Sequence, residues 1–276
     1  MDNYPAGSDA PFYDKDEGGT VEYYGTAIEL NQIGEFNNLT INLDNPASVA
    51  TFTASSFDVN GNFSVNSGIF QFNDAVSTDN LTVTVDGNVL VGANGGISVG
   101  SANARHEFNL NGNFTNQGVV NFSNRISQTT GSEATNGIVD VNFISPSQDQ
   151  VVDLQNTTNF YRIEINKGVD DTYVVEINAD NPAFFNLFGF ANGGTGGAQE
   201  TTNSNALGLI FGTVKVGNNV TISPLNASGN YNIYEGAQLW VDGGTVEKVA
   251  GTAIVPYGKI RVSAGILNVP INSGIT

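Results

Sequence analysis

The stretch that decides the fold runs from residue 216 to 269 and reads VGNNVTISPLNASGNYNIYEGAQLWVDGGTVEKVAGTAIVPYGKIRVSAGILNV. Three segments in it, 220–222 (VTI), 239–241 (LWV) and 260–262 (IRV), place a polar or amphipathic residue between two apolar ones. This period of two is typical of half-buried β-strands. The three segments are almost evenly spaced, with Gly, Asn, Asp and Ser between them. A repeat of about 20 residues built in this way predicts a β-solenoid, in which each coil covers the core of its neighbour.

The first half of the chain shows a similar period. Gly61, Gly87 and Gly112 lie in evenly spaced Asn-Gly-Asn or Asp-Gly-Asn triplets, each followed by a short strand pattern. We expect these triplets to supply the positive φ that a tight turn needs. Phe and Val should form ladders inside the solenoid, and the turn asparagines should stack outside them. About ten coils at the ~4.8 Å inter-strand spacing would give a rod roughly 50 Å long.

A longer repeat is also visible. The blocks 19–23 (GTVEY), 32–33 (QI) and 36–42 (FNNLTIN) return in the same order as 137–141 (GIVDV), 150–151 (QV) and 160–166 (FYRIEIN). We therefore predict an all-β chain built from two related modules, 19–136 and an enlarged 137–276, behind a polar linker, 1–18. A glycine-rich mobile loop is expected near 193–205. The apolar run 182–190 should form a wide coil or plug over the core, with a ligand groove as the less favoured alternative.

Composition excludes several classes of partner and chemistry. With 9 basic and 27 acidic residues the net charge is −18, which argues against nucleic acid and against anionic membranes. The absence of Cys removes disulfides and cysteine zinc sites, and no apolar run is long enough to span a membrane. With one His, a metal would need oxygen ligands, so calcium is the candidate cation.

Two patterns resemble catalytic machinery. Residues 96–100 (GISVG) match the Gly-x-Ser-x-Gly elbow of hydrolases, and His106 is the only potential histidine base. That motif requires a strand-to-helix turn, so in a glycine-punctuated repeat we expect no catalysis by Ser98. A carboxylate pair from different coils, as glycoside cleavage requires, stays open. Its candidates are Asp140, Asp153, Asp170, Asp171, Asp242 and Glu247.

Three blocks carry a resemblance to a known group of proteins: 18–42, 150–167 and 236–246. They resemble the repeat regions of very large secreted surface proteins of Bacteroidota, adhesin-like β-helical proteins typically exported by the type IX system. The resemblance implies a right-handed parallel β-helix and an extracellular location. It also implies a longer parent chain with a signal peptide and a sorting domain, so we expect this chain to be a segment of such a protein.

The leading functional interpretation is a non-enzymatic extracellular stalk or adhesin segment that contacts glycan. The alternative is a carbohydrate-active β-helix, either a polysaccharide lyase or a glycoside hydrolase. A lyase usually needs a Lys or Arg base, and no basic cluster is present. Binding to ice or a crystal surface through a threonine face is disfavoured, because the threonines do not keep one position across coils.

The candidate ligand-binding residues are Thr221, Trp240 and Arg261. If the three VTI, LWV and IRV segments stack, these residues all face outward on neighbouring coils, and Trp240 lies beside Arg261 in cation–π contact. The favoured interpretation is that they cover the outer wall. The sharper hypothesis is a shallow sugar platform formed by the indole and the guanidinium.

Overall fold

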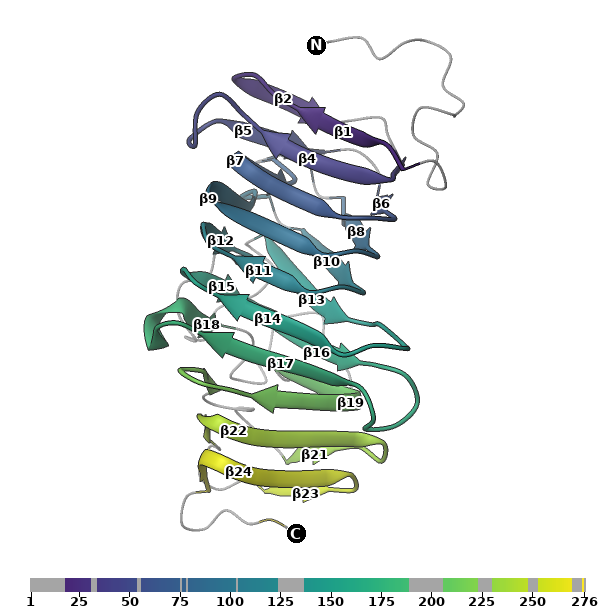
Figure 1. The fold of residues 1–276 in the computed structure, drawn as a ribbon, viewed down its shortest axis with the longest axis vertical. Coiled ribbons are helices and arrows are strands. Elements are labelled where there is room, and N and C mark those ends of the chain that lie inside the picture. The colour runs from purple at the N-terminus through teal and green to yellow at the C-terminus, as the bar shows by residue number, and fades with distance from the viewer. Residues whose placement is uncertain are drawn as a thin grey trace.

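The computed structural model describes residues 18–30, 34–53, 56–74, 76–77, 79–102, 104–123, 137–188, 206–222, 230–247, 253–269 and 275. These residues form a parallel β-helix, and every strand pairing between named strands is parallel. Figure 1 shows the coils stacked along the long axis in a right-handed winding, with β1 and β24 at opposite ends. Within the described residues the one helical element is a 3₁₀ turn, Pro182–Phe184. The predicted all-β solenoid is confirmed.

Each coil offers up to three strand positions, which we call A1, A2 and B. Position A1 holds β1 (Thr20–Tyr23), β4 (Asn38–Asn42), β11 (Phe114–Asn116), β14 (Gln150–Leu154) and β17 (Val174–Ala179). Position A2 holds β2 (Ala27–Leu30), β5 (Val49–Phe52), β12 (Val119–Asn121), β15 (Thr158–Phe160), β18 (Phe185–Leu187) and β20 (Thr221–Ile222). The long strands β7 (Phe63–Phe72), β9 (Val89–Val99), β22 (Ala237–Glu247) and β24 (Lys259–Asn268) run through both.

Position B closes the coil behind these strands. It holds β3 (Glu35–Phe36), β6 (Phe57–Val59), β8 (Thr82–Val85), β10 (Arg105–Leu110), β13 (Ile138–Phe143), β16 (Arg162–Asn166) and the start of β19 (Leu207–Val216), which then bends into A1. In the last two coils, β21 (Tyr231–Ile233) and β23 (Ile254–Pro256) form a separate two-stranded parallel sheet.

One inward-facing ladder counts the coils of the described chain. It runs, one residue per coil, through Val21, Leu39, Phe63, Val89, Phe114, Val152, Ile177, Val216, Val241 and Val262. The expected ten coils are confirmed. Two steps, from Phe114 to Val152 and from Ile177 to Val216, take much more chain than the others. They contain residues 124–136 and 189–205, so the loop expected near 193–205 lies outside the described residues, as does most of the 1–18 linker.

The core is a stack of phenylalanine and aliphatic side chains, as expected. Phe63 meets Phe70 at 5.1 Å between ring centroids, and Phe122 meets Phe160 at 5.7 Å. The run 182–190 was expected to form a wide coil or plug over the core. Its described part lies in the long step from Ile177 to Val216, where Phe185 points inward, is buried and lies 5.7 Å from Phe160, so it covers the core as the rung β18 and not as a plug.

The turn glycines lie in turns between strands, as predicted, but for a different reason. None of Gly61, Gly87 and Gly112 has a positive φ. Their backbones stack so closely that a Cβ on Gly87 would lie 2.4 Å from the carbonyl oxygen of Gly61, and one on Gly112 would lie 2.1 Å from that of Gly87. Glycine is therefore required by contact between coils and not by backbone conformation.

Asparagines beside these glycines form a ladder outside the core, as predicted. The side-chain oxygen of Asn38 accepts from the backbone N–H of Asn62, Asn62 accepts from Asn88, and Asn88 accepts from Asn113, at 2.8 to 2.9 Å. Asn113 continues the ladder by accepting from the N–H of Val151 at 2.8 Å. Each bond joins one coil to the next and satisfies a turn N–H that the sheets leave unpaired.

The sheets run without interruption past the predicted module boundary at 136/137. Strand β13 pairs with β10 before it and β16 after it. The matched sequence blocks also occupy different positions, since residues 19–23 contribute to A1 and residues 137–141 contribute to B. The internal match therefore aligns strands of similar pattern and not equivalent places in the coil. The division into two modules stays a prediction.

Replacing Gly112 with Ala should destabilise the solenoid, because the new methyl group would lie within 2.1 Å of the Gly87 carbonyl oxygen. We expect a loss of ~1–3 kcal/mol or more in the free energy of unfolding, measured by urea denaturation. Gly34→Ala is the matched control, because nothing lies within 4 Å of its Cβ position and its φ is not positive. Equal effects at the two sites would contradict stacking as the reason for glycine.

Candidate functional site

Trp240 lies in a column of outward-facing side chains near the C-terminal end of the solenoid. Its strand neighbours in register are Lys215 of β19 and Arg261 of β24. The Arg261 guanidinium carbon lies 4.0 Å from the indole centroid, and the Lys215 ammonium nitrogen lies 4.7 Å from it. The two cations come from the coils on either side, so both faces of the indole are covered by cation–π contacts.

The edge of the indole is also engaged. Trp240 Nε1 donates to Ser263 Oγ at 2.6 Å, and Ser263 Oγ donates to Asp242 Oδ1 at 2.6 Å. Lys215 Nζ bridges Asp242 at 3.0 Å and Glu176 at 3.3 Å. The hydrogen bonds from Ser263 and Lys215 hold the pKa of Asp242 below its usual value. Burial opposes the charge on Lys215, but its two carboxylate partners raise its pKa overall.

The loop that precedes β17 contacts the neighbouring column of side chains, which includes Thr213, Gln238 and Lys259. Asp171 Oδ2 lies 2.6 Å from Lys259 Nζ and accepts from Gln238 Nε2 at 3.0 Å. The backbone carbonyl of Asp171 accepts from Thr213 Oγ1 at 2.7 Å. The hydrogen bonds from Lys259 and Gln238 lower the pKa of Asp171. The Asp171 carboxylate therefore joins this loop to β22 and β24, and the Asp171 backbone carbonyl joins it to β19.

Thr221 does not belong to this column, which corrects one predicted contact. The LWV and IRV segments stack as predicted, with Trp240 opposite Arg261. The VTI segment instead enters A2, where Thr221 pairs with Thr245. Its expected place beside Trp240 is taken by Lys215. Both strand positions of a coil show the same alternation of inward and outward residues, so the pattern alone does not distinguish them.

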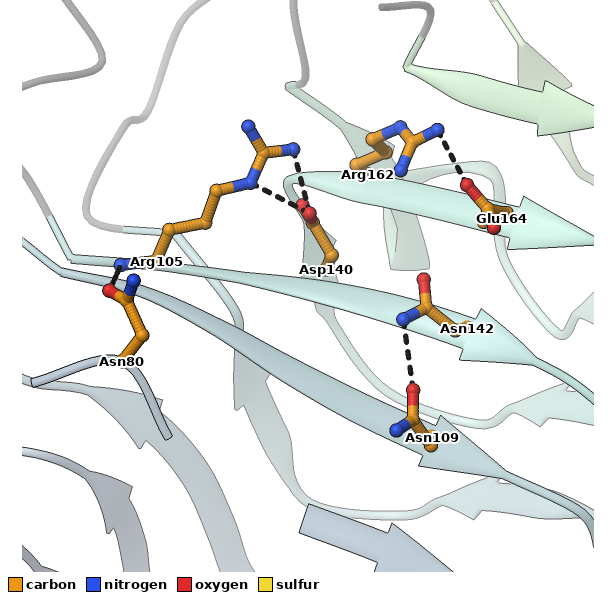
Figure 2. Close-up of polar contacts among 7 residues, drawn as sticks. All are labelled: Asn80, Arg105, Asn109, Asp140, Asn142, Arg162 and Glu164. Atoms are coloured by element: carbon orange, nitrogen blue, oxygen red, sulfur yellow. Dashed lines mark hydrogen bonds and ion pairs between the residues drawn. The ribbon is translucent and has the colours of Figure 1, made fainter. Parts of the chain in front are cut away.

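A second polar cluster covers the B face of coils five to seven (Figure 2). Arg105 places Nε and Nη2 each 2.7 Å from Asp140 Oδ2, and Arg162 Nη2 lies 2.7 Å from Glu164 Oε2. Arg162 is buried, and Gly208 on the next coil leaves room for it, since a Cβ there would lie 2.8 Å from the guanidinium. These ion pairs join residues of the same wall and leave no open pair of carboxylates in the drawn cluster.

One buried lysine closes a corner between faces B and A1. Lys167 is fully buried, and its Nζ donates to Gln150 Oε1. Gln150 Nε2 in turn donates to the carbonyl oxygens of Leu110 at 3.1 Å and Gly112 at 2.6 Å. Burial lowers the pKa of Lys167 to about 8, against the favourable charge of Asp149. No sequence pattern indicated this contact, because it joins coils through side chains 17 residues apart.

The residues of the apparent hydrolase motif lie on opposite sides of the wall. Ser98 is an outward residue of β9, and its Oγ donates to Gln71 Oε1 at 3.4 Å. His106 points inward from β10, is fully buried and lies 5.8 Å from the Phe72 ring. Its Nδ1 accepts from the N–H of Leu81 at 3.0 Å, so it is a core residue and not a base for Ser98.

The carboxylates proposed as a pair are distributed over separate contacts. Asp140 binds Arg105, Asp171 binds Lys259, Asp242 binds Lys215, and Asp153 accepts from Gln155. No described group of three or more His, Cys, Asp or Glu residues is placed to hold a metal ion, so calcium stays a prediction without a site. In the part of the chain that the structure describes, no helix is long and apolar enough to cross a membrane.

Three comparisons of this chain with known proteins found no match. No protein-family model matches it, and no curated protein and no solved structure is significantly similar to it.

Sequence reasoning missed Lys215, Asp242 and Ser263 as neighbours of Trp240. A signal for Lys215 was present, since it precedes Trp240 by 25 residues, which is also the interval between the turn glycines Gly87 and Gly112.

His106 should make the protein lose stability as the pH falls below neutral. Burial lowers its folded-state pKa to about 4, whereas the unfolded imidazole titrates near 6.5. Between these values the unfolded state takes up a proton and the folded state does not, so the free energy of unfolding should fall by up to ~3 kcal/mol from pH 6.5 to 4. Urea denaturation across this range measures the slope.

The matched variant for that experiment is His106→Asn, whose side-chain oxygen can still accept from the N–H of Leu81 but cannot ionise. Its stability should change much less over the same pH range. A variant that keeps the full slope would show that another group is responsible.

Arg261→Met should uncover one face of Trp240 while keeping a long apolar side chain. We expect acrylamide to quench tryptophan fluorescence more strongly, with at most ~1 kcal/mol lost in the free energy of unfolding. Lys259→Met, on the same strand but bound to Asp171, should leave the quenching unchanged. Unaltered quenching in Arg261→Met would show that the guanidinium does not shield the ring.

Proposed function

We propose that this chain is a non-enzymatic stalk segment of an extracellular adhesin-like surface protein. The observation that carries the proposal is the continuity of the stack. The same inward ladder runs through all ten described coils, and the walls outside it are tied from coil to coil by hydrogen bonds and ion pairs. Such a structure supplies length and stiffness, which are the properties a stalk needs.

The parallel β-helix is equally compatible with a carbohydrate-active enzyme, so side-chain chemistry must distinguish the two. A glycoside hydrolase needs one carboxyl group with a raised pKa to act as general acid. Asp171 and Asp242 have lowered pKa values because they accept hydrogen bonds, including one each from a lysine, and Asp170 has a lowered pKa because it accepts from Thr172. Ser98 and His106 are separated by the wall. These contacts support the non-enzymatic proposal.

The extracellular location rests on the resemblance of blocks 18–42, 150–167 and 236–246 to secreted surface repeats. A chain without Cys and with a net charge of −18 fits such a setting, since it needs no defined redox environment and stays soluble through charge.

The test of the proposal is a search for turnover. The protein is incubated with neutral and acidic polysaccharides, and the release of reducing ends and of unsaturated products is measured. We expect neither product above the level of a heat-denatured control, because hydrogen bonds lower the pKa values of Asp170, Asp171 and Asp242 and so oppose a role as proton donor. Turnover that disappears in Asp242→Asn or Glu247→Gln would favour the enzyme instead.

A further inference from the structure

An open groove of about 470 Å³ lies on the A2 face of coils two to five, far from Trp240. Its lining includes Pro46 in the turn before β5, Ile69 of β7, Gly96 and Ser98 of β9, and Val119 and Asn121 of β12. In Figure 1 these strands lie one below the other along the axis. The volume falls in the range of sites for small organic ligands, ~300–1,000 Å³.

The floor of the groove is an apolar column with one side chain missing. Strand register places Ile69 beside Gly96, and Gly96 beside Val119. A Cβ on Gly96 would lie 3.0 Å from the Val119 carbonyl oxygen and 3.5 Å from Ile69 Cγ1, so glycine leaves a notch between two apolar side chains. Val119 is 57% exposed and, together with Ile69, gives the groove an apolar surface.

One side of this floor carries hydroxyl and amide groups with spare hydrogen-bonding capacity. Ser98 makes one long bond, to Gln71 at 3.4 Å, and Asn121 accepts one long bond, from the N–H of Ser123 at 3.4 Å. The exposed Asn94 side chain, also in the lining, has no hydrogen-bond partner among the described residues. The groove thus combines an apolar strip with neutral donors and acceptors.

The charges on and around the groove favour an uncharged ligand. No lining residue is ionisable. The sequence has no Lys or Arg between Lys15 and Arg105, so every charged residue of coils two to four is acidic. An anionic ligand would meet repulsion without a compensating cation, and an uncharged ligand would meet none.

Backbone pairing argues against a peptide. Strands β7 and β9 are paired on both sides, β7 with β4, β5 and β9, and β9 with β7, β11 and β12. Their N–H and C=O groups are therefore used within the sheet, and strand addition needs a free edge.

We propose that this groove binds a neutral saccharide. The C–H face of a sugar ring covers Ile69 and Val119 across the Gly96 notch, and its hydroxyl groups bond to Ser98, Asn94 and Asn121. This inference deepens the adhesive role and rests on the proposed function in that respect. Failure of this inference can be distinguished from failure of the proposed function, because the proposed function is tested by measuring turnover and the groove is tested by measuring binding.

The test uses the whole chain and defined ligands. Cellotetraose, xylotetraose, mannotetraose and maltotetraose are titrated by calorimetry, with tetragalacturonate and an extended Ala-Ser peptide for comparison. We expect at least one neutral tetrasaccharide to bind more tightly than either comparison ligand. Val119→Lys should weaken that binding by about tenfold or more, because it places a hydrated charge on the apolar strip. Val169→Lys, at an 82% exposed valine outside the groove, should leave it unchanged.

Tryptophan fluorescence adds a second readout. Trp240 lies four coils beyond Val119, or ~19 Å along the axis, so saccharide in the groove should not move its emission. The inference is overturned if no neutral tetrasaccharide binds, if the acidic sugar or the peptide binds more tightly, or if Val119→Lys and Val169→Lys have equal effects. It is also overturned if binding shifts the Trp240 emission, which would place the sugar at the column of Lys215, Trp240 and Arg261.

Discussion

The distance between neighbouring coils, ~4.8 Å, is the constraint on which this structure depends. Residues at one register position lie directly above one another, so the side chains of a column have a fixed spacing. Each side chain must therefore pack against, or bond to, its neighbours in the same column. Inside, this selects Phe, Val, Leu and Ile in stacks. In the turns it brings backbones so close that a methyl group does not fit between Gly87 and Gly112. The asparagine ladder follows from the same distance, because an amide side chain spans the step to the next turn.

The same spacing explains the arrangement of charge on the outer wall. Columns of like charge at this distance would repel, and a chain with 27 acids and 9 bases has few cations to separate them. Where cations are described, most sit against acids: Lys215 lies between Glu176 and Asp242, and Lys259 lies on Asp171. Trp240 separates Lys215 from Arg261 and offers each of them an aromatic face. The indole is thus part of the wall's own electrostatic balance.

The fold could be predicted from the sequence because short-range patterns in the sequence reflect the period of the coil. Alternating residues, glycine turns and a nearly constant interval between them identified the solenoid and its number of coils. The register of single segments was harder to predict, as Thr221 shows. It was assigned to the column of Trp240, but it lies in A2, because A1 and A2 share one alternation and the long step from Ile177 to Val216 breaks the period. The reason for glycine at position 112 could not be predicted either, since it is a close contact with Gly87 of the preceding coil and no local sequence pattern indicates it.

Binding capacity in such a wall arises where a column is interrupted. At Trp240 the column is continuous, so each polar and aromatic group already has a neighbour one coil away. At Gly96 the side chain is absent and the glycine itself is buried, so the apolar surface of the groove comes from the flanking Ile69 and Val119. The apolar surface there stays exposed beside the hydrogen-bonding groups of Ser98 and Asn121. The sequence indicated Trp240 as the candidate binding residue, whereas the groove lies at Gly96. Only the strand register of three coils distinguishes this glycine from the others.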